Sequence, residues 1–285
     1  MSIGPTRGTL IPIGGKLSDD AILQRFLALA GGVGAARIAI IPTASNEPDM
    51  GTWYERAFAR LGASRARAIA FEERCDCDDA DWLEELELAT GIFITGGDQL
   101  KLASIVGGTP AHRMIQQRFA AGVSVAGTSA GAAIMSRFMI ARGDEGPSPR
   151  VGMVMLAAGF GLAEGLIIDQ HFRERDRLGR LLTAIALAPE CLGLGVDENT
   201  AAVISPDGTI EVMGAGAVTI VDASGMGMVT VADAKPGEAF TMTGVRVHLL
   251  APGAVFNIAN RRAHPAHAVT THDPLEKSTA RRSRR

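Results

Sequence analysis

The chain has 285 residues, of which 47 % are hydrophobic and 21 % are charged, and its net charge is −3 at pH 7. This length is enough for a large hydrophobic core, and a charge so near zero does not favour binding to nucleic acid or to an anionic membrane. The three cysteines, Cys75, Cys77 and Cys191, are too few for a disulfide framework, and no set of His, Cys, Asp or Glu has the spacing of a metal site. Since we find neither a signal peptide nor an apolar run of about 18 residues, we expect a cytoplasmic protein.

The first 200 residues alternate between short apolar runs, which are typical of buried strands, and segments with helical spacing. We expect strands over residues 9–13, 37–41, 67–71, 91–95, 123–126, 166–172 and 192–196. We expect helices over residues 21–30, 53–61, 79–89, 110–122 and 173–187. Ser18 or Asp19 would cap the first helix, and Thr109 followed by Pro110 would start the fourth. This alternation predicts an α/β fold with a mostly parallel central sheet and helices on both faces.

Beyond Ala201 the pattern changes to short β-type runs separated by turn residues. Asp207-Gly208, Ser224-Gly225 and Lys235-Pro236-Gly237 each indicate an antiparallel hairpin. We interpret this part as a smaller antiparallel continuation of one α/β domain that spans residues 1–262. Residues 263–285 have no apolar period and end in Arg-Arg-Ser-Arg-Arg, so we expect a disordered basic tail there.

Residues 127–131, Gly-Thr-Ser-Ala-Gly, fit the pattern G-x-S-x-G that places a nucleophilic serine on a tight turn between strand and helix. The turn would expose the hydroxyl of Ser129, and the N–H groups that follow could stabilise an oxyanion. Gly14-Gly15, residues 43–45 and residues 96–98 also follow predicted strands, where ligands collect in parallel sheets. The pattern is short, however, and a chain rich in glycine and alanine also produces it by chance.

A serine nucleophile needs a base, normally a histidine that a carboxylate holds in place. Of six histidines, only His171 lies at a predicted strand end among polar residues, although it also fits a structural role there. Glu198, at the end of another strand that we expect in the same sheet, could orient His171. Asp197 competes with Glu198 for that role.

Four arginines, Arg173, Arg175, Arg177 and Arg180, follow His171 directly. They form either a solvated helix face or a set of guanidinium groups that bind carboxylates of a substrate.

Three of these segments together resemble the cyanophycinases, which are serine peptidases related to aspartyl dipeptidases and, in fold, to class I glutamine amidotransferases. The segments are Gly127–Ala132, Asp169–Leu181 and Asp197–Thr200, and the resemblance covers about residues 8–260. It implies an exopeptidase that hydrolyses cyanophycin, a polyaspartate with arginine on each β-carboxyl, and that releases β-Asp-Arg dipeptides through an acyl-enzyme. It also implies a homodimer without cofactors.

The resemblance assigns roles to individual residues. Ser129 would be the nucleophile, His171 the base and then the acid, and Glu198 the group that orients His171. The backbone N–H groups of Gly97 and Ala130 would form the oxyanion hole. The residues that would line the substrate pocket are Gln99, Asp169, Gln170, Arg175, Arg177 and Arg180. Two alternatives remain open: an aspartyl dipeptidase for small peptides, and a binding protein that has lost turnover.

Overall fold

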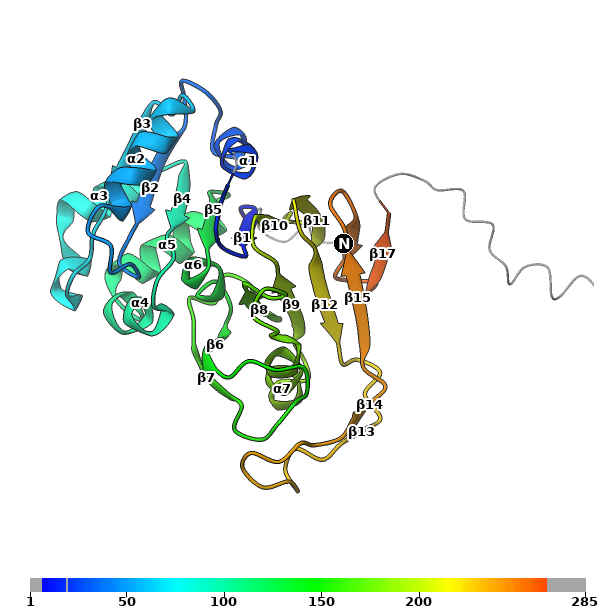
Figure 1. Ribbon diagram of the computed structural model, residues 1–285. Helices are drawn as coiled ribbons and strands as arrows, with labels where there is room; N and C mark the ends of the chain where they lie inside the picture. Colours follow the sequence, from blue (N-terminus) through cyan, green and yellow to red (C-terminus); the bar gives the residue numbers. More distant parts are fainter. Residues whose placement is uncertain (1–6, 19, 266–285) are drawn as a thin grey trace, which may run out of the picture.

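The computed structural model describes residues 7–18 and 20–265. Its largest unit is a nine-stranded sheet with the order β17-β16-β11-β10-β1-β5-β4-β2-β3 (Figure 1). The strands of its parallel half are β1 (Leu10–Ile13), β2 (Arg37–Ile41), β3 (Arg65–Ala68), β4 (Gly91–Ile94) and β5 (Ser124–Thr128). The antiparallel half consists of β10 (Thr200–Ile204), β11 (Thr209–Gly214), β16 (Val255–Asn257) and β17 (Arg262–His264).

Helices cover both faces of the parallel half, as the sequence predicts. Side chains alternate between the two faces of each strand, so Ile38 and Ile40 of β2 pack toward one face and Ala39 and Ile41 toward the other. The first face is covered by α1 (Ala21–Leu29) and α2 (Met50–Arg60). The helices on the second face are α3 (Ala80–Leu88), α4 (Gln99–Val106), α5 (Pro110–Ala120) and α6 (Ala130–Ala133), with the 3₁₀ helix Arg74–Asp78 beside them.

A second, four-stranded sheet has the order β15-β12-β9-β8. Its strands are β8 (Leu166–Gln170), β9 (Leu192–Val196), β12 (Val218–Asp222) and β15 (Arg246–Leu250). One face, with Ile168 and Leu194, joins the core beneath the nine-stranded sheet, and α7 (Leu178–Leu187) covers the other face. The strands before His171 and Glu198, β8 and β9, are neighbours in one sheet, as expected, but the strand before Ser129 belongs to the other sheet. Both edges of β1 are already occupied, by β5 and β10, so β8 and β9 pair with each other elsewhere.

Two small ribbons complete the part of the chain that the structure describes. β6 (Phe138–Gly143) pairs with β7 (Val154–Ala158), and β13 (Met228–Val229) pairs with β14 (Met242–Thr243) on an arm that extends away from both sheets (Figure 1).

Two of the three predicted hairpins are confirmed. Asp207-Gly208 joins β10 to β11, and Lys235-Pro236-Gly237 lies between β13 and β14. The hairpin at Ser224-Gly225 is wrong, because β12 pairs with β9 and β15 and not with the next strand. Strand β17 continues to His264, two residues past the domain boundary expected at 262, and residues 266–285 of the expected tail lie outside the described residues.

Several elements differ from the predictions, and four of these differences concern the start of an element, its place or its existence. Helix α1 is preceded by Asp20 and not capped by Ser18, whose N–H instead donates to Asn199 Oδ1; Asp19 lies outside the described residues. The third strand occupies residues 65–68 and not 67–71. Helix α4 was not predicted, although Asp98 caps it by accepting from the N–H groups of residues 100 and 101. The last helix begins at Leu178, five residues later than expected, because the residues before it form turns.

The predicted cap of α5 is confirmed, since Thr109 Oγ1 accepts from the N–H of residue 112.

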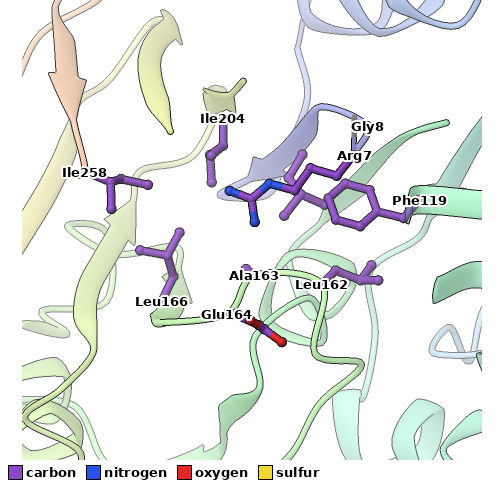
Figure 2. A pocket seen from close by; sticks show the side chains of 10 residues that line it. Arg7, Gly8, Phe119, Leu162, Ala163, Glu164, Leu166, Ile204 and Ile258 are labelled. Atoms are coloured by element: carbon purple, nitrogen blue, oxygen red, sulfur yellow. The ribbon is translucent and has the colours of Figure 1, made fainter. Parts of the chain in front are cut away.

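A hollow of about 20 Å³ lies at the amino ends of β1 and β8 (Figure 2), whereas Ser129 follows the carboxyl end of β5. Phe119, Leu162, Leu166 and Ile204 line it, and its volume is that of about one water molecule. It is therefore too small and too distant from the serine to hold a substrate.

In the described residues, we find no helix with the length and apolarity that crossing a membrane requires.

Candidate active site

Ser129 lies at the sharp turn between β5 and α6, with the backbone angles φ 53° and ψ −112°. Such a conformation is rare for a residue with a side chain and costs about 1–3 kcal/mol. The turn is close-packed: a Cβ on Gly127 would lie 2.4 Å from the carbonyl oxygen of Gly131, and a Cβ on Gly131 would lie 2.2 Å from that of Ile94. The Ser129 N–H donates to Ile13 O at 2.9 Å. Backbone contacts therefore fix the turn that carries the Ser129 side chain.

His171 reaches the serine from the end of β8. Its Nε2 lies 3.0 Å from Ser129 Oγ, and its Nδ1 lies 2.8 Å from Glu198 Oε1. The backbone of the loop after β1 holds the ring in place, because the His171 N–H donates to Gly14 O and a Cβ on Gly15 would lie only 2.3 Å from the ring carbon Cε1. The three side chains thus form one continuous hydrogen-bonded chain.

The structure separates the two neighbouring acids that the sequence left open. Asp197 is buried and accepts hydrogen bonds from the N–H groups of Arg173, at 3.1 Å, and Ala217, at 2.9 Å. Its carboxylate is therefore used to hold the turn after His171. Of the two acids, only Glu198 contacts the imidazole of His171.

The ionisation of the pair suits base chemistry. The pKa of His171 is lowered below its ordinary value, mainly by burial. The positive charges of Arg175 and Arg177 lower it further, whereas the hydrogen bond with Glu198 raises it. The hydrogen bond from His171 lowers the pKa of Glu198, and Lys16, whose Nζ lies 3.6 Å from Oε2, adds to this effect. At neutral pH the imidazole is therefore free to accept a proton while the carboxylate remains ionised.

The backbone N–H groups of Gly97 and Ala130 donate to no acceptor among the described residues. A Cβ on Gly96 would lie 3.3 Å from Ser129 Cβ, so this loop runs directly past the nucleophile. Gly97 has φ +141°, and a Cβ there would lie 1.9 Å from Ala44 O. Only glycine fits this position. Because neither N–H group has an acceptor among the described residues, both could donate to an anionic oxygen, as the sequence predicts.

Three residues expected in the substrate pocket are instead buried beneath the site. Asp169, Arg177 and Arg180 are 1 %, 6 % and 4 % exposed. Arg180 binds the Asp169 carboxylate through two nitrogens, with Nε 2.7 Å from Oδ2. Arg177 donates to both oxygens of Gln170, and Gln170 Oε1 lies 3.5 Å from Ser129 Oγ. The single Asp169 carboxylate lies beside both guanidinium groups, with Arg177 Nη1 3.6 Å from Oδ1, and both arginine side chains are buried. Neither is therefore exposed at the surface where the sequence suggested that it would meet a substrate carboxylate.

Of the three other predicted pocket residues, Gln170 is also buried, whereas Arg175 and Gln99 keep polar atoms available. Arg175 is exposed and makes no ion pair within the described residues, yet its charge still acts on His171. Gln99 uses its amide nitrogen to donate to Ile140 O and Ala141 O, at 3.1 and 2.9 Å, which ties α4 to β6. Its Oε1 accepts no hydrogen bond from the described residues.

Sequence reasoning expected Gly14-Gly15 to lie where ligands collect, but it missed the ion pair of Lys16 with Glu198. The sequence signal for Lys16 was its position directly after a glycine pair at the end of a predicted strand.

Across residues 7–18 and 20–265, no three His, Cys, Asp or Glu side chains are grouped as metal ligands would be.

Three comparisons with known proteins bear on this geometry. Residues 11–212 match the model of peptidase family S51. A cyanophycinase from Trichormus variabilis is 40 % identical over 266 residues, which cover 92 % of this chain and 89 % of that protein. A cyanophycinase from Geminocystis herdmanii is 41 % identical over 263 residues, covering 90 % and 95 %. The crystal structure of a peptidase from an acI-B1 actinobacterium is similar in fold, with a TM-score of 0.62 and 23 % identity over 86 % of this chain and 98 % of that one.

Proposed function

The chain belongs to peptidase family S51, and on that premise we propose that it is a cyanophycinase, a serine exopeptidase that releases β-Asp-Arg dipeptides from an end of cyanophycin. Two relatives about 40 % identical over most of their length carry that name. The observation that supports the proposal most directly is the hydrogen-bonded chain from Ser129 through His171 to Glu198.

The mechanism begins with attack of Ser129 Oγ on the carbonyl carbon of the scissile backbone bond, while His171 Nε2 takes the hydroxyl proton. The N–H groups of Gly97 and Ala130 stabilise the negative oxygen of the tetrahedral intermediate. His171 then gives the proton to the leaving amine, and an acyl-enzyme remains on Ser129. A water molecule, deprotonated by His171, attacks the ester carbonyl and releases the second product with the regenerated hydroxyl.

Glu198 holds the imidazole in the tautomer whose Nε2 accepts the serine proton, and it stabilises the imidazolium that forms. We assign substrate contact to the exposed Arg175 and to Gln99 and Gln170, which keep polar atoms without partners among the described residues. The buried pair of Asp169 and Arg180 acts instead by positioning β8, and Arg177 positions Gln170 beside the nucleophile.

Incubation of the purified enzyme with cyanophycin, followed by mass analysis of the products, tests this proposal. We expect β-Asp-Arg from the wild type and none from Ser129→Ala of unchanged thermal stability. Hydrolysis of small α-linked aspartyl peptides without attack on the polymer would instead identify an aspartyl dipeptidase. Binding of cyanophycin without any product would identify a protein that has lost turnover.

We further propose a homodimer in the cytoplasm. Strand β15 is an edge strand on which Val247 and Leu249 are exposed, the latter by 76 %, and a second copy would cover such an apolar edge. The free thiols of Cys75, Cys77 and Cys191 suit a reducing compartment. Light scattering should give a dimer mass for the wild type and a monomer mass for Leu249→Lys. Cell fractionation should recover the protein with cytoplasmic markers.

A further inference from the structure

Trp53 is a large aromatic side chain that the proposed mechanism does not use. It lies in the first turn of α2 and is 52 % exposed, while its edge-to-face contact with buried Tyr54, at 4.7 Å and 84°, fixes its orientation. Hollows of about 370 and 300 Å³ lie on either side of it. The first is lined by Glu47, Asp49, Met50, Trp53 and Tyr54, and the second by Leu17, Ser18, Asp20, Leu23, Trp53 and Arg60.

The loop after β1 lies between the second hollow and the catalytic residues. Gly15 packs on the imidazole of His171, and Lys16 forms an ion pair with Glu198 at 3.6 Å. Leu17, the next residue, lines the hollow together with Trp53. Two residues of extended chain span at most about 7 Å. The loop from Gly15 to Leu17 therefore gives a short route by which a polymer at Ser129 would reach the indole ring.

The charges around Trp53 favour a cation on one side. In the second hollow, Asp20 is already paired with Arg60, which donates to both carboxylate oxygens at 2.8 Å. In the first hollow, the carboxylates of Glu47 and Asp49 are exposed and make no ion pair or hydrogen bond with any other described residue. An aromatic face beside two unpaired carboxylates suits a guanidinium group, which stacks on the ring and donates hydrogen bonds in its plane.

We propose that Trp53, Glu47 and Asp49 form an outer subsite that binds a guanidinium group of the polymer several units away from the scissile bond. The inference rests on the proposed function, because cyanophycin presents one such group on every unit. The subsite favours long chains over short ones, and it would distinguish this enzyme from a peptidase for small aspartyl peptides.

The test compares a long soluble cyanophycin oligomer with a substrate of only two β-Asp-Arg units. For Trp53→Ala, and separately for Glu47→Gln combined with Asp49→Asn, we expect KM for the long substrate to rise roughly three- to fivefold. The values of kcat for both substrates and of KM for the short one should stay unchanged. Trp53→Phe keeps an aromatic face and should retain most of the affinity. The matched charge control is Glu84→Gln with Glu87→Gln, two exposed carboxylates on α3, and it should behave as the wild type.

An equal rise of KM for both substrates, or the same rise in the α3 control, would overturn the subsite. So would a change of oligomeric state in Trp53→Ala, because the surface would then be a subunit interface. If the wild type cleaves the long substrate and the Trp53 and Glu47/Asp49 variants match it, only the subsite is refuted. If the wild type cleaves neither substrate, the proposed function itself fails, and the subsite fails with it.

Discussion

The two sides of the active site are held in place by different physical means. The nucleophile side belongs to the nine-stranded sheet, and close backbone packing at Gly97, Gly127 and Gly131 fixes it without charged side chains. The base side belongs to the four-stranded sheet, and buried charges fix it: Asp169 with Arg180, and Asp197 with the turn after His171.

This difference implies two kinds of sensitivity. On the nucleophile side a single added methyl group collides with backbone that cannot move, so a substitution there displaces the catalytic atoms directly. On the base side the loss of one charge leaves its partner buried and uncompensated, so a substitution there destabilises the fold first. Four predictions test the contrast.

The largest expected effect separates two adjacent acids on the base side. Glu198→Gln removes the charge that stabilises the imidazolium and should lower kcat by about 10⁴-fold with little change in stability. Asp197→Asn weakens the turn, since Asp197 holds two backbone N–H groups, and should lower the melting temperature more than it lowers kcat. Steady-state kinetics and thermal melts of both variants decide this, and equal kinetic losses would refute the separate roles.

The next effect concerns stability. Asp169→Asn leaves Arg180 buried without its counter-charge and should lower the free energy of unfolding by about 3–5 kcal/mol. Urea unfolding followed by circular dichroism measures it. As a control, Glu85→Gln removes a partner of the half-exposed Arg65 and should cost far less. A loss for Asp169→Asn no larger than for the control would contradict the role assigned to the buried pair.

On the nucleophile side, Gly97→Ala should lower kcat by about 10²–10³-fold, because the loop must move away from Ala44 and take its N–H donor with it. Gly108→Ala is a suitable control: φ there is also positive, at +75°, but a Cβ meets nothing within 4 Å. If both variants lost the same activity, general backbone strain would explain the loss and the oxyanion donor would not.

The smallest effect is a shift in pH dependence. Protonated His171 cannot act as a base, so kcat/KM should fall as the pH drops through its pKa, which burial holds below the ordinary value. Arg175→Gln removes a positive charge that disfavours the imidazolium, so the pKa of His171 should rise and the acidic limb should move to higher pH. Arg56→Gln, an exposed arginine that does not act on His171, should leave the limb in place. A limb that stays fixed in Arg175→Gln would contradict the electrostatic account.

The sequence predicted best what local chemistry determines. Thr109-Pro110 begins a helix and Asp207-Gly208 turns a hairpin, because each acts on its nearest neighbours. The positions of Ser129, His171 and Glu198 were also predictable, since each follows an apolar strand.

Long-range pairing was the part that the sequence could not give. Whether β8 joins β1 or β9 depends on which edge is free, and no local pattern encodes that. Arg177 and Arg180 looked like a solvated or substrate-binding face because their buried partners, Asp169 and Gln170, lie seven to eleven residues earlier, on β8. The late start of α7 depends on positive φ angles at two residues with side chains, His171 and Asp176, which composition does not indicate.

The central claim, that Ser129 is a nucleophile activated by His171, is tested most directly by covalent labelling with a serine-directed fluorophosphonate. Mass analysis of the digested protein locates the label. We expect modification of Ser129 alone in the wild type, and a labelling rate at least about 100-fold lower in His171→Ala, because the hydroxyl is a poor nucleophile without its base. Labelling at another serine, or an equal rate in both proteins, would contradict the claim.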